Sequence, residues 1–256
     1  MEFGVTVGDD LDRLEKTAAD FAFAEFGLGE ALDVPGAIDD ARLDNLLAER
    51  DQSLVVHLPF KQDVATPVPE INDAILAYQE RLLDWAAARG ARKAVLHATV
   101  RDPYDTGLRS TAADQLSRVV AAGEKRGVEI VVENVGHQPR GLQLSVLGDI
   151  ADEVGLPVCF DVGHAYMEDG NEGIERFCKR HGDRISHLHV HDVRGRGDTH
   201  MPLGAGEVDG DPVARHLDGF DGTVAVEVFT DDVALLRDTA ARAASWFGES
   251  GDATNC

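Results

Sequence analysis

The sequence predicts a single (β/α)8 barrel, the TIM-barrel architecture, and three observations lead to this fold class. Short apolar runs alternate with longer segments of helical periodicity, about eight times over within 256 residues. Alternating strands and helices imply a parallel sheet. Four of the runs end in Glu, Asp or His, and a barrel gathers such strand ends at one mouth. A doubly wound open sheet is the runner-up, but no Gly-x-Gly-x-x-Gly turn follows the first predicted strand.

The predicted strands are runs of about five residues that are rich in β-branched and other apolar side chains, as buried strands are. In chain order they are Phe3–Val7, Ala22–Phe26, Leu54–Leu58, Ala94–His97, Val128–Glu133, Pro157–Asp161, Ile185–His191 and Thr223–Phe229.

The predicted helices fill the segments between these strands and repeat their apolar residues at helical spacing. They are Leu11–Ala19, Asp39–Glu49, Pro69–Arg89, Thr111–Arg126, Gln143–Glu153, Gly173–Arg180 and Val233–Phe247, with a weaker helix over Pro212–Leu217. Four glycines fall where helices should stop, namely Gly90, Gly127, Gly155 and Gly182. We expect one domain over residues 1–247, followed by a polar tail over residues 248–256.

Composition narrows the protein class. No run reaches the roughly 18 apolar residues that span a bilayer. Met1–Val5 lacks the basic start of a secretory signal, so a cytoplasmic location is expected. Three irregularly spaced cysteines do not make a disulfide framework, and Cys159 lies in an apolar run as a core residue would.

The charge is strongly acidic, with 47 Asp and Glu against 24 Lys and Arg and a net charge of -23. The acids are spread along the whole chain, which keeps a surface hydrated at high salt. We therefore expect a halophilic protein. The alternative is that the charge serves to repel nucleic acid. We expect neither a nucleic-acid nor a membrane partner, and homo-oligomer formation is left open.

Four strand-end residues form the candidate centre: Glu133, Asp161, His189 and Glu227. A buried strand has little use for an ionisable group unless that group is paired or coordinated. A single Glu at a strand end is usually a surface residue. Four ionisable residues at the same edge of a sheet, however, indicate one site. Three carboxylates and an imidazole suit Mn²⁺, Mg²⁺ or Co²⁺. Such an ion can polarise a carbonyl and stabilise an enediolate.

Further polar residues follow the same strands or the loops after them. His57, His97, His164, Asp198 and His200 are candidates for additional metal or substrate contacts. His187 and His191 alternate with His189, so all three share one side of the sheet, and we interpret the outer two as packing or supporting residues. His137, His181 and His216 lack such a context and are interpreted as solvated.

At these residues the chain resembles the xylose-isomerase-like TIM-barrel superfamily, which contains sugar and sugar-phosphate isomerases and epimerases as well as endonuclease IV. The resemblance extends from about Val5 to Phe229. Its motifs here are Glu133-Asn134, Asp161-Val162-Gly163-His164, His189-Val190-His191-Asp192, Asp198 through Glu207, and the final Glu227.

The resemblance implies roles for these residues. Glu133, Asp161, His189 and Glu227 would hold a metal, and Glu133 and Glu227 would also act as the acid–base pair of a sugar isomerase or epimerase. His164 would contact the substrate, and Arg194 or Arg196 would bind it as well. The expected partner is then a small sugar or sugar phosphate.

Endonuclease IV is the rival within the same superfamily, because His57, His97, His164, Asp198 and His200 resemble its further metal ligands. A multi-metal zinc centre suits cleavage of phosphodiesters such as abasic DNA. The mouth loops carry few arginines for DNA, however, and the first strand lacks that family's Gly-x-His-x-Ser start. A non-catalytic barrel is the third hypothesis, and the intact ligand set argues against it.

Overall fold

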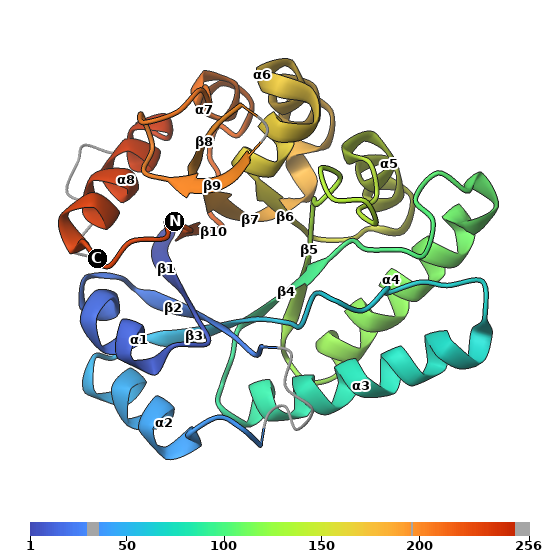
Figure 1. The fold of residues 1–256 in the computed structure, drawn as a ribbon, viewed down its shortest axis with the longest axis horizontal. Coiled ribbons are helices and arrows are strands. Elements are labelled where there is room, and N and C mark those ends of the chain that lie inside the picture. The colour runs from blue at the N-terminus through green and yellow to red at the C-terminus, as the bar shows by residue number, and fades with distance from the viewer. Residues whose placement is uncertain (30–35, 196, 249–256) are drawn as a thin grey trace.

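A computed structural model describes residues 1–29, 36–195 and 197–248. Eight strands close into a barrel in the order β1-β10-β7-β6-β5-β4-β3-β2, and every neighbouring pair is parallel (Figure 1). The barrel strands are β1 Glu2–Gly8, β2 Phe23–Gly27, β3 Ser53–His57, β4 Lys93–His97, β5 Glu129–Glu133, β6 Val158–Asp161, β7 Ile185–Val190 and β10 Thr223–Val226. The predicted (β/α)8 barrel is confirmed.

Helices surround the strands on the outside of the barrel (Figure 1). They are α1 Leu11–Thr17, α2 Asp40–Glu49, α3 Pro69–Ala88, α4 Arg109–Glu124, α5 Leu144–Val154, α6 Val162–His181, α7 Asp211–His216 and α8 Val233–Trp246, with 3-10 turns η1 Ala18–Asp20, η2 Thr106–Leu108 and η3 Gly182–Arg184. Outward-facing strand residues such as Val56, Leu96 and Val132 belong to the main core with residues from these helices.

A second, smaller apolar cluster fills the inside of the barrel. It consists of Phe23, Val55, Val95, Val131, Cys159 and Ala225, all fully buried. Each of these residues is followed two positions later by a polar residue, whose side chain lies on the same face of the strand. These followers are Glu25, His57, His97, Glu133, Asp161 and Glu227. The barrel therefore has an apolar floor with ionisable groups above it, toward the carboxyl ends of the strands.

The structure corrects the expected course of the chain after the sixth strand. The predicted helix over Gly173–Arg180 is only the second half of α6, which begins at Val162 and is interrupted at Gly170 (φ 66°). The start of this helix is marked by Asp161, whose side chain accepts a hydrogen bond from the backbone N–H of His164, as a helix N-cap does. The first half of the helix was missed because Asp161 was interpreted only as a strand-end metal ligand.

A second difference concerns the segment after β7, which was expected to be a loop. It forms an antiparallel hairpin of β8 (Asp192–Arg194) and β9 (Gly197–Met201) over the barrel mouth. Gly90, Gly127 and Gly155 end helices with φ of 68°, 72° and 75°, as predicted. Gly182 also follows a helix but keeps φ at -54° and begins η3.

No helix in the described part of the chain is long and apolar enough to cross a membrane. Of the predicted tail over residues 248–256, only Gly248 lies within the described residues.

Candidate metal centre

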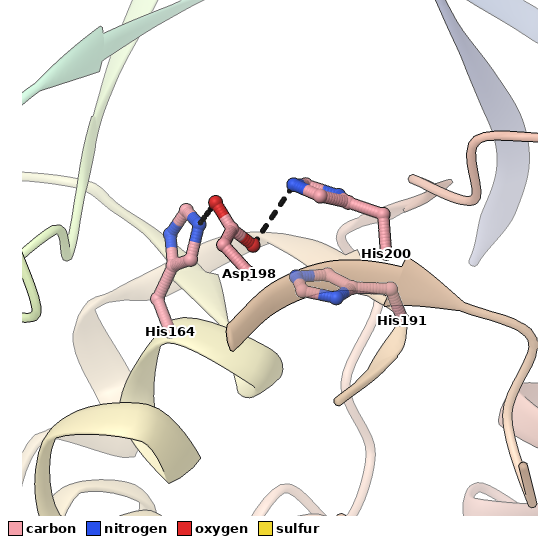
Figure 2. A group of neighbouring side chains, drawn as sticks. All are labelled: His164, His191, Asp198 and His200. Atoms are coloured by element: carbon pink, nitrogen blue, oxygen red, sulfur yellow. Dashed lines mark ion pairs between the residues drawn. The ribbon is translucent and has the colours of Figure 1, made fainter. Parts of the chain in front are cut away.

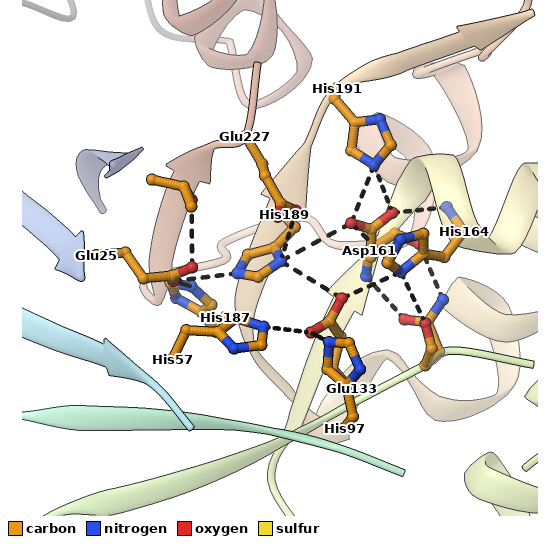
Figure 3. A network of polar contacts seen from close by, with 12 residues as sticks. Glu25, His57, His97, Glu133, Asp161, His164, His187, His189, His191 and Glu227 are labelled. Carbon is orange, nitrogen blue, oxygen red and sulfur yellow. Dashed lines mark hydrogen bonds and ion pairs between the residues drawn. The ribbon is translucent and has the colours of Figure 1, made fainter. Parts of the chain in front are cut away.

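The four strand-end residues come together at the carboxyl end of the barrel (Figure 3). Each offers one ligand atom, and those atoms all lie within 4.8 Å of one another. Nδ1 of His189 lies 3.0 Å from Glu227, 3.6 Å from Glu133 and 3.8 Å from Asp161. We call Glu133, Asp161, His189 and Glu227 the central group. All four are buried.

Asp161 is held by contacts from three directions. Its backbone N–H donates to the side-chain oxygen of Asn134 at 2.8 Å, and the amide nitrogen of Asn134 donates to its carbonyl at 3.0 Å. His191 lies 3.0 and 3.1 Å from its two carboxylate oxygens. Because the N-cap contact to His164 occupies Oδ1 as well, Oδ2 is the oxygen of Asp161 that faces His189.

Glu133 lies among four histidines. Its Oε2 atom is 3.3 Å from His57 and 3.1 Å from His97. Its Oε1 atom is 3.1 Å from Nδ1 of His164 and faces His189 on the other side. His57, His97 and Glu133 form a further set whose ligand atoms lie within 4.8 Å of one another, which we call the lateral group.

A third set lies beside the central group, and two of its residues come from β9 of the hairpin. Figure 2 shows His164, His191, Asp198 and His200, whose ligand atoms also lie within 4.8 Å of one another. The Asp198 carboxylate bridges His200 at 2.9 Å and His164 at 3.5 Å. We call these four residues the outer group. The hairpin brings Asp198 and His200 back over the mouth, where Asp198 contacts His164 on α6 and His200 stacks on His191, which follows β7.

Burial and mutual charge set the pKa values of the central group. Burial alone would raise the pKa of Glu133, but the rings of His97 and His189 outweigh it and hold that pKa well below its usual range. His164 and His191 lower the pKa of Asp161 in the same way. Burial alone would lower the pKa of His189, yet the carboxylates of Glu25, Glu227 and Glu133 raise it well above its usual value.

The pKa values of the outer group are shifted by the same causes. Burial is again outweighed, and the Asp198 and Glu227 carboxylates raise the pKa of His200 to about 9. His164 and His200 hold the pKa of Asp198 well below its usual range. Without a metal, imidazolium rings therefore supply the positive charge between these carboxylates. A metal ion that binds here must displace those protons, since histidine ligates a metal as neutral imidazole.

The residues fit a metal ion. Nδ1 of His189, Oε2 of Glu227 and Nε2 of His164 are buried and have no hydrogen-bond partner among the described residues. Buried polar atoms rarely lack a hydrogen-bond partner. A divalent cation in the central group would accept electron pairs from His189 and Glu227. The donor set of three carboxylate oxygens and one imidazole nitrogen suits Mn²⁺, Mg²⁺ or Co²⁺.

Sequence reasoning missed Glu25, which is fully buried on β2. Its Oε2 atom lies 3.0 Å from Nε2 of His187 and 3.1 Å from Nε2 of His189. The signal was present, because Glu25 interrupts the apolar strand Phe23-Ala24-Glu25-Phe26. Asn134, predicted only as part of the Glu133-Asn134 motif, is a second supporting residue.

Of the two arginines predicted to bind substrate, the structure describes only Arg194. Arg194 is exposed and donates to the backbone carbonyl of Ala205 at 2.8 Å, and Arg196 lies outside the described residues. Two exposed aromatic rings contact histidines of the lateral and outer groups. Phe60 (44 % exposed) stacks on His97, and Phe229 (64 % exposed) stacks on His200.

Two histidines that were expected to be solvated are not. The side chain of His137 is 13 % exposed, and its ring centroid lies 4.2 Å from that of His164. His181 is buried and contacts Asp152 at 2.8 Å. Their burial was missed because neither histidine belongs to an apolar run that would indicate it. His216 is partly covered and contacts Glu175 at 2.6 Å.

Cys159 is buried in the barrel floor, as predicted for a core residue. Burial raises the pKa of its thiol well above the usual value, so the thiol stays protonated at neutral pH.

The chain is similar to known proteins in sequence and in fold. A protein of Methanocaldococcus jannaschii, MJ1614, is 26% identical over 179 residues, which cover 64% of this chain and 68% of that protein. The structure of D-psicose 3-epimerase with D-tagatose from Clostridium cellulolyticum H10 has a TM-score of 0.72 at 17% identity, covering 96% of this chain and 98% of that one.

The TTHB071 protein of Thermus thermophilus, from a crystal soaked with ZnCl₂, has a TM-score of 0.67 at 26% identity, covering 94% of this chain and 99% of that one. Residues 16–249 match a family model described as xylose isomerase-like TIM barrel. The chain belongs to the xylose isomerase-like TIM-barrel family.

Proposed function

We propose that this protein is a divalent-metal-dependent isomerase or epimerase of a small sugar or sugar phosphate. The observation that carries the proposal is the central group, in which two glutamates, Glu133 and Glu227, both face Nδ1 of His189 at the barrel mouth. Two carboxylates beside a bound metal would be placed to transfer protons next to a carbonyl that the metal polarises.

Glu133, Asp161, His189 and Glu227 would hold the ion. When bound, a divalent ion at this position would polarise a carbonyl oxygen and stabilise the negative charge that develops on it. Mn²⁺, Mg²⁺ or Co²⁺ fits the oxygen-rich donor set.

The two glutamates would move the proton. The pKa of Glu133 lies well below its usual range, so this carboxylate is ionised and able to accept a proton from carbon. For isomerisation, Glu133 would return the same proton to the neighbouring carbon. For epimerisation, Glu133 would keep that proton, and Glu227 would deliver a proton of its own to the opposite face of the carbon. His164, whose Nε2 atom faces the Asp198 carboxylate at 3.5 Å without a hydrogen bond, would donate to a substrate oxygen.

The rim of the mouth supports a small ligand with apolar C–H faces. Phe60 and Phe229 expose their rings beside the lateral and outer groups, and a sugar presents C–H bonds that pack on such rings. The fold shared with D-psicose 3-epimerase adds support, since that protein was crystallised with a ketose.

The test is a panel of ketoses, aldoses and their phosphates, assayed after the metal-free protein has been reloaded with Mn²⁺ or Co²⁺. We expect turnover of at least one substrate and its loss in Glu133→Gln and Glu227→Gln. Exchange of solvent deuterium into the product would report the proton transfer. Failure of every sugar with both metals would refute the proposal.

A specific observation favours a second candidate, a multi-metal phosphoesterase of the endonuclease IV type. Glu133 is shared between the central and lateral groups, and the outer group adjoins them, so the ten residues of the three groups could together hold more than one zinc ion: His57, His97, Glu133, Asp161, His164, His189, His191, Asp198, His200 and Glu227. Such a centre could activate water and stabilise both oxygens of an in-line displacement.

Charge weighs against abasic DNA as the substrate of this second candidate. The net charge is -23, and two of the arginines on the described mouth loops, Arg101 and Arg140, are paired with Asp63. Metal counting separates the candidates: one ion per chain supports the isomerase, and two or three zinc ions with incision of an abasic duplex would establish the phosphoesterase.

A further inference from the structure

We infer that Glu25 is a positioning residue that fixes the ring of His189, so that Nδ1 is the nitrogen presented to the metal ion of the central group. The inference rests on the proposed function, because it assumes that the central group holds a metal. Glu25 lies on β2, and none of the four residues of the central group comes from that strand.

The contacts of His189 divide between its two ring nitrogens. Nε2 lies 3.1 Å from the Glu25 carboxylate, and Nδ1 faces Glu227, Glu133 and Asp161. A neutral imidazole carries one N–H donor and one acceptor nitrogen. A metal ion in the central group would take the place of a proton on Nδ1. Because the Glu25 carboxylate can only accept, the one remaining proton of the ring then belongs on Nε2, and the lone pair of Nδ1 is left for the metal. Metal-ligating histidines commonly donate their other N–H to a carboxylate in this way.

Glu25 is itself prevented from turning away. Its Oε1 atom accepts a hydrogen bond from the hydroxyl of Thr6 at 3.2 Å, and its Oε2 atom also contacts Nε2 of His187 at 3.0 Å. Nδ1 of His187 in turn lies 2.6 Å from the hydroxyl of Thr223. All of these side chains are buried, so the contacts cannot be replaced by water without opening the barrel.

The position of Glu25 separates it from the reacting groups. Figure 3 shows Glu25 on one side of the His189 ring and Glu133 and Asp161 on the other. A residue placed behind a ligand acts on the metal through that ligand. Loss of Glu25 should therefore weaken metal binding and alter the geometry of the bound ion, while the residues of the central group all remain.

The experiment is a titration of metal-free protein with Co²⁺, followed by the visible absorption of the bound ion. Glu25→Gln is compared with Glu129→Gln, which removes a carboxylate at the opposite end of the barrel, where Glu129 pairs with Lys93. We expect the Kd of Glu25→Gln for Co²⁺ to rise roughly 10–100-fold, with an altered absorption spectrum. Glu129→Gln should keep the wild-type Kd and spectrum.

The outcomes separate the inference from the function beneath it. A wild-type Kd and spectrum in Glu25→Gln would overturn the inference and leave the proposed function standing. A wild-type protein that binds no Co²⁺ would refute both. If Glu25→Gln does not fold, Glu25→Asp replaces it, together with imidazole ¹⁵N spectra of the zinc-loaded wild type. Those spectra should show the His189 proton on Nε2, and a proton on Nδ1 would refute the inference.

Discussion

Nδ1 of His189 lies 3.0 Å from Oε2 of Glu227, and neither atom has a hydrogen-bond partner among the residues that the structure describes. Two buried electron-rich atoms facing each other are unfavourable unless a proton or a cation lies between them. The metal-free chain meets this need by raising the pKa of His189, and a divalent ion would meet it better.

Replacement of Glu227 tests this position directly. We expect Glu227→Gln to weaken binding of Mn²⁺ by more than the roughly 10–100-fold that loss of a supporting partner costs, because a ligating oxygen loses its charge. Calorimetric titration of the metal-free protein measures the effect. Asp231→Asn is the control, since Asp231 is exposed on the same loop. Equal Mn²⁺ affinity in the two variants would contradict the assignment of Glu227.

Metal binding should release protons. The pKa of His189 and that of His164 lie well above the usual value for histidine, so both rings are protonated at pH 7 in the metal-free chain. A metal that binds His189 must displace its proton, and the apparent affinity should therefore increase as the pH rises from 7 to 9. Titration in buffers of different ionisation enthalpy counts the protons. A count of zero at pH 7 would show that the ion binds elsewhere.

The stability of the metal-free chain should fall in alkaline solution. The pKa of His200 is raised to about 9 by its carboxylate neighbours, above the value of about 6.5 in an unfolded chain. A raised pKa contributes stability that is fully present below about pH 6.5 and is lost as the pH rises through 9. We expect the Tm in excess chelator to decrease between pH 7 and pH 10, and to decrease less in His200→Gln. Parallel pH profiles for the two proteins would contradict this.

The rule that found the central group from the sequence could have found Glu25 as well. Glu25, Glu133 and Asp161 each stand two positions after a residue of the barrel floor. Attention to strand ends selected the last two and passed over Glu25, which lies within β2 with Phe26 and Gly27 after it. An ionisable residue anywhere on the inward face of a barrel strand is therefore as informative as one at its end.

Other parts of the site had no local signal. Asp198 and His200 were recognised as candidates, but their contact with His164 depends on the β8–β9 hairpin turning back over the mouth. Gly195 lies in the turn of this hairpin with φ of 65°, a left-handed conformation that favours glycine. The spacing of residues in the sequence does not show where the chain turns back. It therefore could not predict that Asp198 contacts His164.

The lateral group provides a test of metal number. If the chain holds a single ion in the central group, His57→Gln with His97→Gln should leave one ion bound. If it holds two or more zinc ions, the double variant should lose one of them, because Glu133 would be the only ligand left of that group. Elemental analysis after reloading with Zn²⁺, and separately with Mn²⁺, distinguishes these outcomes. The isomerase proposal requires one Mn²⁺ ion per chain in both the wild type and the double variant.

The last prediction concerns salt. With 47 acidic and 24 basic residues, the pairing of every Lys and Arg still leaves 23 negative charges, so repulsion among carboxylates exceeds the attraction within ion pairs. Surface pairs such as Arg42–Asp12 and Arg118–Asp73 contribute little stability and weaken in salt. The Debye length shortens from about 10 Å at 0.1 M to about 3 Å at 1 M salt, which suppresses the repulsion over the whole surface.

We therefore expect the Tm to rise when KCl is increased from about 0.1 M to about 1 M, and sucrose at matched osmolality to raise it less. A Tm that is unchanged or lower in KCl would refute the halophilic interpretation, because it would show that the ion pairs outweigh the net charge.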